Sequence, residues 1–174
     1  MIEFRAVVEV TGSHVELSGQ MSRSSFDAAL AAIGEYNRSP QSYAGLLEKK
    51  CLVVAGGLRV RDTATGAQVV PGCCAGLEGW REWLSLVDGE QPWLGHSPDP
   101  GLEFRDGVAR LRQDAERTAE PACEIPLAEV PGHLEGVRRD LIGFLDLVRQ
   151  WAPDGLGDRL AERFDAEFHV SAPL

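Results

Sequence analysis

Residues 102–111, Leu-Glu-Phe-Arg-Asp-Gly-Val-Ala-Arg-Leu, contain a tight turn between two short alternating segments. Asp106-Gly107 is a strong two-residue hairpin signal, because both central positions of that turn favour a positive φ. Pairing across the turn places Glu103 opposite Arg110, which is a favourable cross-strand pair, and gathers the apolar side chains on the other face. The stretch therefore predicts two antiparallel strands.

Most of the remaining strand signals are also joined by tight turns. Residues 2–10 alternate apolar and polar side chains, as a half-buried strand does, and 14–17 can return beside them. Gly56-Gly57 predicts a second hairpin in which the flanking apolar residues face each other. Residues 67–70 follow another turn. A run of sequential strands of this kind favours antiparallel pairing.

Helical spacing of apolar residues occurs in three parts of the chain. It predicts a helix from about residue 24, a short helix over about 76–87, and two amphipathic helices in the C-terminal third, separated at Pro153. In the short helix the expected apolar stripe, with Trp83 alongside it, consists of Leu77, Trp80, Leu84 and Val87.

The order of these elements predicts an α+β fold. Strands and helices do not alternate regularly, so the expectation is a mainly antiparallel sheet with helices packed on one face and two C-terminal helices. A chain of 174 residues suits a single domain, here residues 1–174.

The charge of the chain is strongly negative and unevenly distributed. The net charge is −10, and residues 71–174 account for all of it, because residues 1–70 are balanced. Such a field repels nucleic-acid phosphates and anionic membranes and favours a basic protein partner. We therefore expect no nucleic-acid or membrane partner. Solubility alone also explains an acidic surface.

Targeting and membrane signals are lacking. The N-terminal residues have no basic segment followed by a long apolar run, and no stretch approaches about 18 apolar residues. This predicts a cytoplasmic protein whose four cysteines are reduced thiols.

The adjacent pair Cys73-Cys74 lies just before the predicted short helix. A helix N-terminus lowers the pKa of a nearby thiol, and Arg81 lies within one turn, so a thiolate here can act as a nucleophile or bind a soft metal. Two small buried residues in a tight turn are the alternative interpretation.

His96 lies in a loop rich in proline and glycine. It can act as a general base, with Asp99 as the carboxylate that orients it, and with Cys73 or Cys74 it makes a Cys–His pair. Adding Cys123 or Asp99 gives enough ligands for zinc, but no zinc-type ligand spacing is present. The sequence thus predicts neither a metal nor a cofactor.

Tryptophans and carboxylates of residues 78–93 are the candidate binding residues. Trp83 and Trp93 are candidate anchors, since tryptophan is enriched among residues that dominate binding energy. The accompanying candidate carboxylates are Glu78, Glu82, Asp88 and Glu90. No phosphate-binding glycine loop, nucleophile elbow or zinc-protease motif is present.

The region around the cysteine pair carries a resemblance. Residues 71–83, Pro-Gly-Cys-Cys-x-Gly-Leu-Glu-x-Trp-x-x-Trp, and residues 92–100, Pro-Trp-Leu-Gly-His-x-Pro-x-Pro, resemble a pattern in small uncharacterised proteins of GC-rich Gram-positive bacteria. It implies a shared structural or functional unit over about residues 70–114 and no activity. In size, acidity and composition the chain is similar to bacterial toxin-immunity proteins.

Two functional hypotheses follow. The first is a protein-interaction module whose acidic surface binds a basic partner, with an immunity-type protein as one form. The alternative is a thiol-based or metal-dependent enzyme that uses Cys73 or Cys74 with His96 and Asp99.

Overall fold

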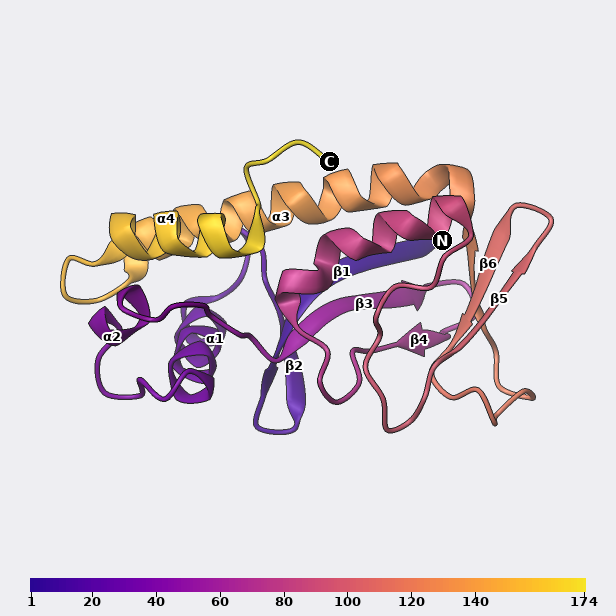
Figure 1. Cartoon of the computed structure of the whole chain (residues 1–174), viewed down its shortest axis with the longest axis horizontal. Helices are drawn as coiled ribbons and strands as arrows, with labels where there is room; N and C mark the ends of the chain where they lie inside the picture. The colour runs from indigo at the N-terminus through magenta and orange to yellow at the C-terminus, as the bar shows by residue number, and fades with distance from the viewer.

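The N-terminal strand forms the centre of a four-stranded antiparallel sheet. The structure is a computed structural model that describes residues 1–174. Strands β1 (Ile2–Val10), β2 (Ser13–Glu16), β3 (Gly56–Asp62) and β4 (Gln68–Val69) lie in the order β2-β1-β3-β4 (Figure 1). The strands expected at the N-terminus and after residue 66 are thereby confirmed.

One face of this sheet is apolar and lies against helices. On β1 the side chains of Phe4, Ala6 and Val8 are buried, and Phe4 and Ala6 pair across the sheet with Val60 and Leu58 of β3. Helix α3 (Val130–Trp151) and the 3₁₀ helix η1 (Leu77–Asp88) run along this sheet in Figure 1, and both contact β1. Burial of this apolar face is the main stabilising contribution to the fold.

The prediction of a hairpin turn at Gly56-Gly57 is wrong. Both glycines lie inside β3 and pair with Val8 and Val7 of β1, so the chain does not reverse there. A Cβ atom at Gly56, where φ is +151°, would lie 2.1 Å from the carbonyl oxygen of Val7. Gly56 therefore allows close approach of two backbones in a sheet, a use of glycine that a sequence cannot distinguish from a turn.

The Asp106-Gly107 hairpin is confirmed. Strands β5 (Gly101–Arg105) and β6 (Val108–Arg112) pair across it, with Glu103 opposite Arg110 as expected. A third strand, β7 (Cys123–Pro126), pairs with β6 and completes a second antiparallel sheet. Sequence analysis missed β7, because it is only four residues long and follows a polar segment.

Helix η1 has a different winding from the one expected. Its buried side chains recur at every third residue, as three residues per turn require: Leu77, Trp80, Trp83 and Leu86. The expected α-helical stripe placed Leu84 and Val87 in the core, but Leu84 is half-buried and Val87 is exposed. Gly89 ends the helix in the left-handed conformation.

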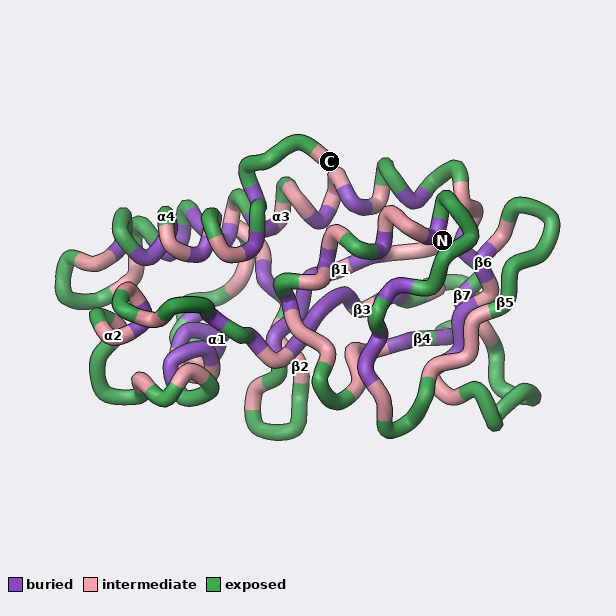
Figure 2. Tube along the Cα trace, viewed as in Figure 1, coloured by how far each residue is buried: buried purple, intermediate pink, exposed green.

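Three helices confirm the helical spacing of the sequence: α1 (Arg23–Tyr36), α3 and α4 (Gly157–Phe168). Two short turns were not expected, the single turn α2 (Ala44–Leu47) and the 3₁₀ turn η2 (Leu127–Glu129) before α3. In Figure 2 buried and exposed stretches alternate along α3 and α4, as expected of amphipathic helices. The fold is therefore α+β with two C-terminal helices. None of its helices meets the length and hydropathy needed to span a bilayer.

The C-terminal tail after α4 is held by side chains of other elements. Each backbone carbonyl from residue 168 to residue 173 accepts a hydrogen bond from a side chain. Trp80 donates to Phe168, and Arg138 of α3 donates to Val170 and Ser171. Arg81 donates to the remaining three carbonyls, those of His169, Ala172 and Pro173.

Candidate functional site

The loop of the cysteine pair and the loop of His96 lie side by side. The amide N–H of Cys73 donates to the carbonyl oxygen of His96 over 2.8 Å, and the His96 N–H donates back to Cys73 over 3.1 Å. Gly72 adds a third hydrogen bond, from its N–H to the carbonyl oxygen of Leu94, at 3.0 Å. These bonds hold residues 73 and 96 next to each other. The sequence alone did not show that these two residues meet.

Two glycines make this close approach sterically feasible. A Cβ atom on Gly72 would lie 2.7 Å from the carbonyl oxygen of His96, and one on Gly95 would lie 2.6 Å from the carbonyl carbon of Gly72. Gly95 also has a φ of +80°, which disfavours other residues. A side chain at either position would push the two loops apart.

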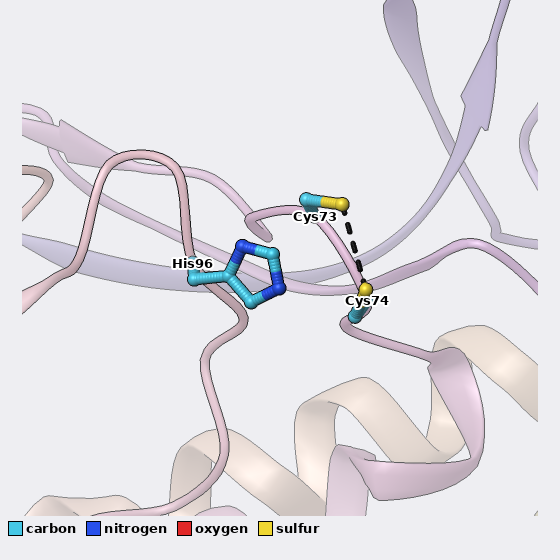
Figure 3. Close-up of side chains that lie close together, drawn as sticks. All are labelled: Cys73, Cys74 and His96. Atoms are coloured by element: carbon cyan, nitrogen blue, oxygen red, sulfur yellow. Dashed lines mark hydrogen bonds between the residues drawn. The ribbon is translucent and has the colours of Figure 1, made fainter.

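The three side chains form one cluster at the surface. The Sγ atoms of Cys73 and Cys74 are 3.5 Å apart, and together with a ring nitrogen of His96 they lie within 4.8 Å of one another. In Figure 3 the edge of the imidazole ring farthest from the backbone faces the two sulfur atoms. Both cysteines are exposed and His96 is half-buried.

Asp99 does not orient His96. The Nδ1 atom of His96 lies 3.1 Å from the hydroxyl of Ser97 instead. Asp99 is exposed, and its backbone carbonyl accepts a hydrogen bond from Ala115. The expected Cys–His–Asp arrangement is therefore not assembled, because the backbone directs the loop's serine and not its aspartate to the ring.

The thiol of Cys73 is less acidic than expected. Its pKa is raised, first by the hydrogen bond with Cys74 and the charge of that neighbour, with Glu9 contributing in the same direction. The start of η1 does not compensate, since the N–H of Leu77 donates to the carbonyl oxygen of Val54 over 3.0 Å. The raised pKa means that a smaller share of Cys73 is thiolate at a given pH.

The other two cysteines lie apart from this cluster. Cys123 is fully buried in β7, where burial raises its pKa to about 11 and its thiol donates weakly to the carbonyl oxygen of Val60. It cannot complete a zinc site with Cys73, Cys74 and His96, as had been considered. Cys51 is an exposed free thiol.

Trp93 lies next to the cysteine pair and is accessible. Its side chain is 57% exposed, its Nε1 donates to the carbonyl oxygen of Cys74 over 3.0 Å, and its ring centroid is 6.3 Å from that of His96. Trp83, the other candidate anchor, is only 4% exposed. The prediction that Trp83 binds a partner is therefore wrong, since the 3₁₀ winding turns it into the core.

The four candidate carboxylates of this region remain free of ion pairs. They are all exposed, and none lies within 4.0 Å of a basic nitrogen: Glu78, Glu82, Asp88 and Glu90. At three residues per turn Glu82 and Asp88 share one side of η1, whereas Glu78 shares another side with Arg81. Arg81 is the only lysine or arginine between residues 62 and 104, and its guanidinium is bonded to the C-terminal tail. It therefore neither activates the cysteines nor neutralises the carboxylates.

An open groove adjoins the cysteine pair. It has a volume of about 410 Å³, and Cys73 and Cys74 line it together with Glu9 and His14 of the β1–β2 hairpin. No lysine or arginine lines it. Burial lowers the pKa of His14, which favours its neutral form. Sequence analysis missed these hairpin residues, since only the fold brings residues 9 and 14 near residue 73.

The comparisons with known proteins give no relative. No family model, curated protein or solved structure matches this chain.

Proposed function

We propose that this protein binds a basic protein partner through a surface made of Trp93, the carboxylates of η1 and Glu90, which follows η1. The observation that carries the proposal is that Glu78, Glu82, Asp88 and Glu90 are exposed and unpaired, while the one neighbouring arginine is used elsewhere. Unpaired carboxylates attract a basic surface without first having to break an internal ion pair.

Trp93 is the anchor of this surface. More than half of its side chain is accessible, and the hydrogen bond to Cys74 already holds its indole in place. A preordered aromatic side chain loses little conformational entropy on binding, which is one reason that tryptophan often dominates interfaces. Trp93 and the first turn of η1, at Gly76 and Gly79, line the same small apolar pocket, so the aromatic anchor adjoins the acidic helix.

The electrostatic character of the surface sets its kinetics. Opposite charges accelerate encounter, and salt screens them over about 8–10 Å at ordinary ionic strength. Association with the partner should therefore slow markedly as salt is added. An immunity-type protein that neutralises a basic toxin is the specific form suggested by the compositional similarity to immunity proteins. We place this complex in the cytoplasm, where four free thiols are stable.

Charge reversal tests the proposal. Wild-type protein is used to isolate its partner from the source cells, the partner is purified and its basic character measured, and affinity is then compared with a quadruple variant, E78K/E82K/D88K/E90K. The matched control reverses four exposed, unpaired carboxylates elsewhere, as E116K/D154K/D158K/E162K. Loss of at least tenfold in affinity in the η1 variant alone is expected. Equal affinity of the two variants, or an acidic partner, would overturn the proposal.

The thiol-based enzyme, with Cys73 or Cys74 as nucleophile and His96 as base, is the second candidate function. A nucleophile needs a thiolate, and the raised pKa of Cys73 reduces that form at neutral pH. His96 also lacks the carboxylate partner that the hypothesis required.

A further inference from the structure

The exposure of Cys73 and Cys74 does not fit a packing role. Free cysteine is usually buried as a small apolar residue, and Cys123 in the same chain behaves in that way. Cys73 and Cys74 are instead open to the groove, with their sulfur atoms 3.5 Å apart beside a ring nitrogen of His96. Two sulfurs and an imidazole nitrogen are the ligand types that thiophilic metal ions prefer.

We propose that Cys73, Cys74 and His96 bind one thiophilic metal ion, with Zn²⁺ as the representative of this class, and that the fourth coordination position is open to the groove. The proposal is independent of the acidic surface of η1. It rests on the geometry of three side chains and on the backbone that holds them.

The distances are close to those that coordination requires. Zinc binds sulfur at about 2.3 Å and nitrogen at about 2.0–2.1 Å, so in a tetrahedral site neighbouring ligand atoms lie about 3.5–3.8 Å apart. The two sulfurs already meet this requirement, and the widest separation in the cluster, within 4.8 Å, needs only small side-chain rotations to close. No movement of the backbone is implied.

The backbone of Cys74 explains how adjacent cysteines serve one ion. Successive side chains of an extended chain point to opposite sides, which would separate the two sulfurs. Cys74 has a φ of +66°, a left-handed conformation that is uncommon for residues other than glycine, and its sulfur thereby lies beside that of Cys73. Unusual backbone conformations of this kind concentrate at functional sites.

The hydroxyl of Ser97 contacts the His96 ring at Nδ1. The two atoms are 3.1 Å apart, so in the tautomer that carries its N–H at Nδ1 this group is satisfied and Nε2 keeps a free lone pair. The ring edge opposite the backbone faces the sulfur atoms (Figure 3). Two backbone hydrogen bonds between Cys73 and His96 keep the ring at this position.

The charges around the cluster favour a cation. No lysine or arginine lines the groove, and Glu9 contributes negative charge to the surroundings of Cys73. Metal binding requires both thiols to lose their protons, and a bound cation compensates the resulting negative charge. A carboxylate in the groove lining, that of Glu9, therefore favours a bound cation.

The test is a titration of freshly reduced, metal-free protein with Zn²⁺, in which a chromophoric chelator reports free zinc. We expect one ion per chain and an affinity at least tenfold weaker in each of Cys73→Ser, Cys74→Ser and His96→Gln. Cys51→Ser is the matched control, because it removes an exposed thiol outside the cluster and should leave the affinity unchanged. Circular dichroism of each variant checks that the fold is intact.

Co²⁺ in place of Zn²⁺ reports the ligands directly. Intense near-ultraviolet thiolate-to-cobalt absorption, reduced by either cysteine substitution, together with visible bands of a tetrahedral ion, is the expected result. The proposal is overturned if no ion binds, if Cys51→Ser weakens binding as much as Cys73→Ser, or if His96→Gln leaves both affinity and spectrum unchanged.

Discussion

The ring of Trp83 meets the ring of Phe4 edge to face, with centroids 5.3 Å apart and an angle of 72° between the planes. The ring of His133 also stacks in parallel on the ring of Phe4, with centroids 4.9 Å apart. Phe4 therefore joins η1, β1 and α3 through one aromatic cluster. Such contacts add about 0.5–1.5 kcal/mol per pair to the apolar burial itself.

Replacing Trp83 should destabilise the fold far more than replacing Trp93. Trp83→Ala removes a buried ring from the contact with Phe4 and should lower the free energy of unfolding by about 3–5 kcal/mol. Trp93→Ala removes a ring that is 57% exposed and should change it by about 0.5 kcal/mol or little more. Urea denaturation of both variants measures the two losses of unfolding free energy. Equal losses would contradict the burial of Trp83.

Adding a methyl group at Gly72 should separate the two loops of the cysteine–histidine cluster. The new Cβ would lie 2.7 Å from the carbonyl oxygen of His96, so the Cys73–His96 backbone pairing must open. We expect Gly72→Ala to lower stability by about 1–3 kcal/mol and to weaken zinc binding about tenfold. Gly132→Ala, a helical position with nothing within 4 Å, is the control and should preserve both properties.

The buried thiol of Cys123 should make stability depend on pH under alkaline conditions. Burial raises its pKa from 9.0 to about 11, so between these values the unfolded chain releases a proton that the folded chain retains. The folded state then binds more protons, and its stability decreases as pH rises through this window, by about 2–3 kcal/mol in total.

Cys123→Val isolates this contribution, since tyrosines and lysines titrate over the same range in both proteins. The difference in unfolding free energy between wild type and variant, measured by urea denaturation at several pH values, should shift between pH 9 and 11. A constant difference would show that the thiol is not desolvated as its position in β7 implies.

Arg81→Ala should release the C-terminal tail. The substitution removes three hydrogen bonds to backbone carbonyls, and we expect a loss of about 1–3 kcal/mol together with faster amide exchange in residues 169–174. Arg105→Ala is the control, because that side chain is exposed and pairs only with its neighbour Asp106. Unchanged exchange in the tail of Arg81→Ala would contradict this role.

The sequence predicts those parts of the fold whose signals are local. The Asp106-Gly107 hairpin, the alternating strand at residues 2–10 and the two C-terminal helices each follow from neighbouring residues, and each is confirmed. Gly56-Gly57 was misinterpreted because a turn and a close approach of strands both require glycine. The distinction depends on Val7, which is distant in sequence.

Helix η1 shows a different kind of failure. Leu77, Trp80, Trp83 and Leu86 recur at a spacing of three, but an α-helical stripe through Leu84 also satisfies part of the pattern. Long 3₁₀ helices are uncommon, so the α-helical period was the natural expectation, and the assignment of Trp83 to the surface followed from it.

The candidate site was predictable in its residues and not in its geometry. Cys73, Cys74 and His96 were all identified from the sequence, yet their meeting depends on backbone pairing between residues 73 and 96 and on the left-handed φ of Cys74. The choice of Ser97 over Asp99 as the partner of His96 depends on the same loop conformation.

Trp80, Arg81 and Arg138 contact the C-terminal tail through its main chain, whereas Ser171 also donates its hydroxyl to Asp165 and Val170 is buried. Every amino acid supplies the same carbonyl group, so mutations at the exposed residues 171–173 leave these hydrogen bonds available. Substitutions should therefore be tolerated at the exposed Ala172 and Pro173. Selection that keeps the tail in place should instead act on Arg81 and Arg138. These arginines precede the nearest carbonyl that they bind by 88 and 32 residues.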